Sequence, residues 1–197
     1  MAIDLNDAEP QRDRSLLPPG PYQLKMQINY GGAGADGALR RAKNGRTLML
    51  ELECTVAQGE HRGRKIWDYV TLLLDENAQP ALEADKLDKL RTAVRMGRSK
   101  LRAIVDSAHA LDPNDTSEAA RAKRHFESYA DLDGLVFWAQ LDEQPGSNGY
   151  GPKNTIDFII VPGDPAYPAI PAQAPGHAVV PRKSLAQELD EEIPLIP

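Results

Sequence analysis

The chain has 197 residues, of which 41% are hydrophobic, and its formal net charge is −6. This length suits one domain of about 100–150 residues with tails, or two small domains. Residues 20–160 hold 19 basic and 20 acidic side chains, so the body is nearly neutral and the acidic excess lies toward the two ends. This balance excludes a continuous basic coat for nucleic acid, but it leaves room for local basic patches.

The sequence offers little for catalysis or metal binding. Cys54 is the only cysteine, which leaves neither a disulfide framework nor a cysteine cluster. The four histidines lack a ligand spacing such as HExxH, and no GxxxxGK[ST] phosphate loop occurs. No apolar run approaches the roughly 18 residues of a membrane span, and no signal peptide opens the chain. We expect a soluble cytoplasmic protein that is not an enzyme and has no cofactor or metal.

The first third of the chain begins with an arm and a strand. Residues 1–17 are polar without a sustained period, which predicts a mobile N-terminal arm. The prolines of residues 18–21 then exclude a helix, and residues 22–30 alternate apolar and polar side chains, which predicts a strand. A glycine-rich loop follows at 31–46, with four cations in seven positions: Arg40, Arg41, Lys43 and Arg46. This loop is either a solvated connection or a flap that grips phosphates, and we favour the flap.

Residues 47–74 are the segment around which the chain is organised. Positions 47–56 and 65–74 both alternate apolar and polar residues, and a polar turn with two glycines separates them. This pattern predicts a β-hairpin with one apolar face. Trp67 and Tyr69 fall on the other face. They are either platforms for a ligand or ordinary strand-forming residues that complete a core.

The pattern then changes to a helical period. Apolar residues recur at near-helical spacing over 82–108, with Gly97 as a plausible stop or break. If this helix is continuous, four arginines fall on one face: Arg91, Arg95, Arg98 and Arg102. They form either a solvated face or a basic ridge for binding, and we favour the solvated face. Asp115 or Thr116 can cap a further helix that reaches about Tyr129. Two strands, 135–141 and 154–161, complete the body.

Five short strands with a helical insertion between the third and fourth is the order of an oligonucleotide/oligosaccharide-binding (OB) barrel. Nonspecific binding of single strands needs cations along a groove and aromatic rings on which bases stack. The candidates for stacking are Trp67, Tyr69 and Trp138. The candidates for phosphate contacts are Arg40, Arg41, Lys43, Arg46, Arg62, Arg64 and Lys65.

The body resembles the phage-encoded single-stranded-DNA-binding proteins. The residues that carry this resemblance are LPPGPY at 17–22, GEHRGRKIWD at 59–68, LDG at 132–134 and YGPKN at 150–154. The resemblance implies an OB-type fold and a role in bacteriophage DNA replication or recombination, in the cytoplasm of the bacterial host. It implies no individual DNA-contacting residue, so the candidates above rest on their chemistry alone.

The C-terminal region carries a second resemblance. A segment rich in Pro, Ala and Gly begins after Pro162, and it leads to the acidic and apolar run Asp190, Glu191, Glu192, Ile193, Pro194 and Leu195. This run is similar to the acidic tip of bacterial single-stranded-DNA-binding proteins, which recruits replication and repair enzymes. It departs from that tip because Leu195 replaces an aromatic residue and two residues follow it.

Taken together, the sequence predicts a mobile arm at 1–17, an OB-type DNA-binding domain at 18–165, and a disordered linker with an acidic tip at 166–197. The predicted function is sequence-nonspecific binding of single-stranded DNA, with the tip as a ligand for replication or recombination proteins and a possible homo-oligomer. The alternative is an OB-fold protein-interaction adaptor that does not bind DNA, with the basic patches serving only for solubility.

Overall fold

The computed structural model describes residues 15–78, 82–146, 149 and 151–168. Contacts within the chain divide it into a compact unit that ends at Tyr167 and a second unit, Pro168–Pro197, which lies almost wholly outside the described residues. The acidic run at 190–195 is therefore outside the described part of the chain.

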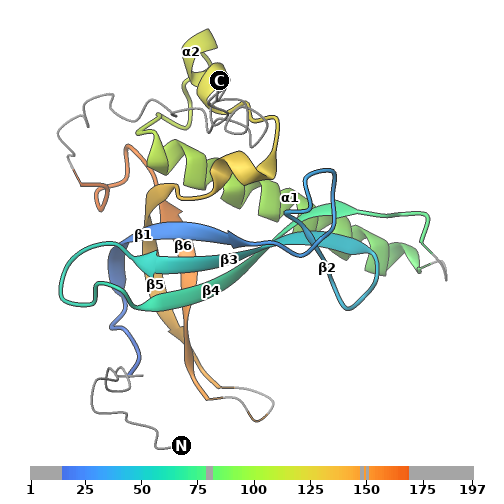
Figure 1. Ribbon diagram of the computed structural model, residues 1–197, viewed down its shortest axis with the longest axis horizontal. Coiled ribbons are helices and arrows are strands. Elements are labelled where there is room, and N and C mark those ends of the chain that lie inside the picture. Colours follow the sequence, from blue (N-terminus) through green and yellow to red (C-terminus); the bar gives the residue numbers. More distant parts are fainter. Residues whose placement is uncertain (1–14, 79–81, 147–148, 150, 169–197) are drawn as a thin grey trace, which may run out of the picture. The chain divides into compact units, whose positions relative to one another are not determined.

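The described unit is a six-stranded antiparallel sheet with one long helix. The strands are β1 (Gly20–Asn29), β2 (Arg40–Arg41), β3 (Thr47–Val56), β4 (Lys65–Leu74), β5 (Val136–Gln144) and β6 (Lys153–Ile160). The helices are α1 (Ala84–Ala108), α2 (Glu118–Lys123) and the 3-10 helix η1 (Tyr129–Leu132), all between β4 and β5. Figure 1 shows α1 alongside the sheet, with α2 above α1 in this view and away from the strands.

Strand β3 lies at the centre of the pairing. It pairs with β4 along its length on one side, while β1 and the short β2 share its other side. β1 also pairs with β5, and β5 pairs with β6. The long strands thus follow the order β4-β3-β1-β5-β6, and the pairing does not join β6 back to β4. The sequence predicted five strands and missed β2, which lies inside the predicted loop.

The alternating residues place the core on the inner face of the sheet. Leu50, Leu52, Cys54 and Val56 of β3 are fully buried, as the period of two predicted. Inward-facing residues of the other long strands join them in one core, together with the second half of α1. Burial raises the pKa of the Cys54 thiol to about 12, with the nearby Asp68 carboxylate as a smaller cause.

Helix α1 continues through Gly97, so the predicted break at this residue is wrong. A Cβ at position 97 would lie 1.9 Å from the carbonyl oxygen of Thr71 on β4. Gly97 therefore permits the helix to approach the β4 backbone, where a larger residue would hold it away. Lys100, one turn further on, pairs with Asp68 of β4 at 2.6 Å and fixes the same contact.

The second predicted helix is much shorter than expected. Ser117 caps α2 by accepting a hydrogen bond from the Ala120 amide, and α2 ends at Lys123, not near Tyr129. Ser128 then begins η1 with a capping box that includes Asp131. None of the described helices combines the length and apolar character that crossing a membrane requires.

Candidate functional site

The outer face of β4 presents two aromatic rings to solvent. Trp67 and Tyr69 are each 54% exposed, whereas their neighbours Ile66 and Val70 are buried. This follows from the strand's alternation, which directs successive side chains to opposite faces. Neither ring is used by the core, and the two project from one strand on the same side.

A groove of about 920 Å³ lies between β4 and the start of β6, where the sheet pairing leaves these two strands unjoined. We call it the β4–β6 groove. Trp67, Tyr69, Arg64 and Lys65 line one side of it. The other side consists of Gln144, Lys153, Asn154 and Thr155. The groove therefore combines aromatic rings, three cations and neutral hydrogen-bonding side chains with one carboxylate, that of Asp68, which pairs with Lys100.

The segment before β1 closes one end of this groove. Leu17 is buried, and its backbone N–H and C=O both bond to the side chain of Asn154 at 2.8 Å. The Arg64 guanidinium donates to the carbonyl of Ser15. Residues 15–17 are thus attached to both β4 and β6, although the sequence assigned them to the arm.

The outer face of β3 places carboxylates directly opposite the aromatic rings. Glu53 is the cross-strand partner of Trp67, and Glu51 is the partner of Tyr69. Each glutamate is paired with a predicted phosphate-binding cation. The Nζ of Lys65 lies 2.6 Å from Glu53, and the Nε of Arg40 lies 2.8 Å from Glu51. These cations are therefore partly neutralised in the absence of a ligand.

The other predicted cations lie at the two ends of β4. Arg40, Arg41 and Lys43 are exposed near the end where β4 finishes, and Arg41 donates to the Gly45 carbonyl at 3.0 Å. Arg62 is exposed in the turn before β4 begins. Cations at both ends of a strand with aromatic rings between them suit a ligand that follows the strand.

Two predicted site residues lie elsewhere. Arg46 is only 5% exposed, and its two terminal nitrogens have no hydrogen-bond partner within the described residues. Trp138 is half-buried on β5 and does not line the β4–β6 groove, and its backbone N–H donates to Ser107 of α1 at 2.9 Å. The structure does not bring Trp138 together with Trp67 and Tyr69.

The sequence also left out four groove residues: Gln144, Lys153, Asn154 and Thr155. Only the arrangement of the strands in space places them opposite β4. The hairpin register could have revealed the pairing of Lys65 with Glu53, because the two residues lie on one face of adjacent strands.

The arginines of α1 are used mainly by local partners. Arg91 pairs with Glu76 and Asp88, and Arg102 donates to the Pro113 carbonyl at 2.8 Å. Within the described residues, no group of three or more His, Cys, Asp or Glu side chains is arranged to hold a metal ion. The chain matches no protein-family model, and no curated protein matches it significantly.

Proposed function

We propose that this protein binds single-stranded DNA without sequence specificity, through the outer face of β4 and the β4–β6 groove. The observation that carries the proposal is the exposure of Trp67 and Tyr69 on one strand beside a groove with three cations. Base stacking on such rings contributes about 1–3 kcal/mol per base and is tolerant of sequence because every base has a π-face.

The strand order supports an OB-type architecture for this site. In that fold the second and third strands form the binding face, and they correspond here to β3 and β4. We propose that the unit is an OB-type barrel left open between β4 and β6. A single strand fits such a face because its bases are unpaired, while a duplex hides them in its stack.

The charges favour contact at the ends of β4 as well as in its middle. Arg40, Arg41 and Lys43 serve one end, and Arg62 and Arg64 serve the other. We leave out Arg46 because its guanidinium is buried, and Trp138 because it lies outside the groove. In this proposal phosphates displace Glu51 and Glu53 from their cations, so binding replaces ion pairs that already exist.

From the resemblances found in the sequence, we propose that this activity serves bacteriophage replication or recombination. The run at 190–195 would then recruit replication or recombination proteins, since its sequence combines three carboxylates with two aliphatic side chains after a Pro-rich segment. The alternative of an adaptor without DNA binding uses the same exposed face for a protein partner.

A titration with fluorescent oligo-dT and with duplex of equal length tests the proposal. We expect binding to the single strand, weak binding to the duplex, and a linear fall of log affinity with log salt as phosphate contacts are lost. No binding at low salt would favour the adaptor, and equal affinity for the two nucleic acids would overturn the proposed preference for single strands.

A further inference from the structure

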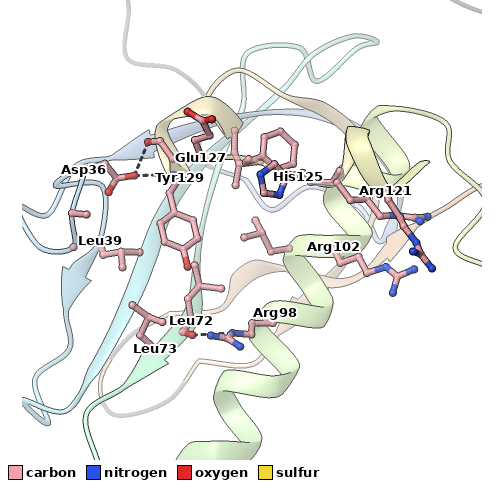
Figure 2. A pocket seen from close by; sticks show the side chains of 18 of the residues that line it. Asp36, Leu39, Leu72, Leu73, Arg98, Arg102, Arg121, His125, Glu127 and Tyr129 are labelled. Carbon is pink, nitrogen blue, oxygen red and sulfur yellow. Dashed lines mark hydrogen bonds between the residues drawn. The ribbon is translucent and has the colours of Figure 1, made fainter. Parts of the chain in front are cut away.

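A second concave site lies on a different part of the molecule from the β4–β6 groove. It is a cavity of about 790 Å³ between loop 34–39, the end of β4, α1 and the segment 116–132. Its floor is aliphatic: Leu39, Leu72, Leu73, Leu101, Val105 and Leu132. Figure 2 shows Tyr129 directed into this space above Leu72.

One side of the cavity carries the guanidinium groups of Arg98, Arg102 and Arg121, which Figure 2 labels, and that of Arg124. Arg102 and Arg124 both pair with Asp106. Arg98 donates through Nε to the Leu72 carbonyl at 3.3 Å, which leaves its terminal nitrogens for other partners. Arg121 is exposed on α2, and its guanidinium makes no hydrogen bond or ion pair within the described residues. The capacity for anions on this side is therefore that of Arg121 and of the terminal nitrogens of Arg98.

The acidic residues on the opposite side do not cancel this capacity. The Asp36 carboxylate accepts hydrogen bonds from Ser128 Oγ at 2.7 Å and from the backbone N–H groups of Tyr129 and Ala38. The bond from Ser128, and then that from Ala38, lowers the pKa of Asp36. The Asp36 carboxylate thus connects loop 34–39 to η1 through these hydrogen bonds. Glu127 is the other acidic residue of the lining, and it is exposed.

An aliphatic floor beside free guanidinium groups fits a peptide in which carboxylates adjoin branched aliphatic side chains. The five leucines and Val105 of the floor give such aliphatic side chains an apolar surface to cover. The chain itself contains this chemistry at 188–196, where Glu188, Asp190, Glu191 and Glu192 precede Ile193, Leu195 and Ile196.

We propose that this cavity receives residues 188–196 of a second copy of the chain. The segment follows about twenty linker residues, whose root-mean-square span is roughly 25 Å for a flexible chain. Copies bound next to one another on one DNA strand would lie within that reach. This last step rests on the proposed function, whereas binding of the segment in the cavity needs no DNA.

The test measures the binding of a fluorescent synthetic peptide of residues 184–197 to the full-length protein. Fluorescence anisotropy of the peptide reports the binding, and no DNA is present. We expect Arg121→Glu to weaken peptide binding at least about fivefold, because it replaces an ion pair with a repulsion. Lys123→Glu is the matched control: it makes the same charge change on the same helix outside the cavity lining, and it should leave affinity unchanged. A peptide with the same composition in scrambled order should bind at least about fivefold more weakly.

Equal loss in the two variants, or equal binding of the scrambled peptide, would overturn the proposal in favour of general charge attraction. Sedimentation then tests the second copy. We expect self-association that rises with concentration and is lost in both Arg121→Glu and the double variant Ile193→Ser/Leu195→Ser. A monomer at every concentration would show that the segment does not come from a second copy, and would overturn the proposal. Arg121→Glu should bind oligo-dT with the affinity of the wild type. The oligo-dT titration therefore tests the proposed DNA binding separately from peptide binding in the cavity.

Discussion

Trp67 on β4 and Glu53 on β3 are direct cross-strand partners on the outer face of the sheet. An exposed ring on which a base could stack therefore has a carboxylate as its nearest neighbour across the sheet. Glu53 is itself held by Lys65 at 2.6 Å. The same arrangement recurs at Tyr69, where Glu51 pairs with Arg40. Any phosphate that approaches this face competes with these two glutamates.

Replacing Glu53 with Gln should tighten binding of single-stranded DNA. The change removes an anion from the face and frees Lys65, whose side chain is about half exposed while that of Glu53 is largely covered. A surface ion pair contributes up to about 1 kcal/mol. We expect affinity to rise about two- to fivefold at low salt in an oligo-dT titration. Asp157→Asn is the control, because it removes one exposed carboxylate of β6 that does not line the groove. If the two variants bind alike, Glu53 does not compete with phosphate.

Replacing Arg40, Arg41 and Lys43 together with Ala should weaken binding and flatten its salt dependence. Each phosphate contact with a single strand contributes a slope of about −0.7 in log affinity against log salt, so three lost contacts change the slope by about 2. The control removes Lys86, Lys89 and Arg95, three exposed cations of α1 outside the groove. An unchanged slope in the loop variant would identify the loop as a solvated connection.

Replacing Arg46 with Met should leave DNA binding unchanged and maintain or raise the melting temperature. The guanidinium is buried and its terminal nitrogens lack partners in the described part of the chain, so the folded state carries a desolvation cost that an apolar side chain of similar length removes. Thermal unfolding and the oligo-dT titration measure the two effects. A large fall in melting temperature, or a loss of affinity with the fold intact, would show that Arg46 has a partner or a role that burial conceals.

Replacing Gly97 with Ala should destabilise the fold by about 1–3 kcal/mol, even though Ala is the better helix former. The added Cβ would meet the Thr71 carbonyl oxygen at 1.9 Å, so α1 must shift away from β4. Urea unfolding measures the change, with Ser99→Ala as a control at an exposed position of the same helix. Equal or greater stability of the Gly97 variant would mean that the helix does not approach β4 in this way.

The strands could be predicted because each long strand buries one face. The alternation in β1, β3, β4 and β5 is a direct record of that burial, and it also identified Trp67 and Tyr69 as outward-facing. Strand β2 has two residues, too few to show a period. Gly97 suggested a break because glycine is a poor helix former, whereas its contact with Thr71 depends on tertiary packing that no local pattern contains.

The candidate site was predictable only in part, for a similar reason. Residues of the hairpin lie together through local pairing, so the sequence located the aromatic rings and the cations that follow the turn. Lys153 and Asn154 join them across the groove only because β6 lies opposite β4. The burial of Arg46 could not be predicted either, because its immediate neighbours in the sequence are polar and suggested an exposed loop.

The most direct test of the central claim follows Trp67 fluorescence in a Trp138→Phe background, where Trp67 is the only remaining tryptophan. We predict that oligo-dT quenches its emission, and that Trp67→Ala in the wild-type protein weakens binding by about 1–3 kcal/mol without lowering the melting temperature appreciably. Phe158→Ala, which removes an exposed ring on β6 outside the groove, should bind like the wild type. Unquenched emission together with equal affinities of the Trp67 and Phe158 variants would contradict DNA binding at this face.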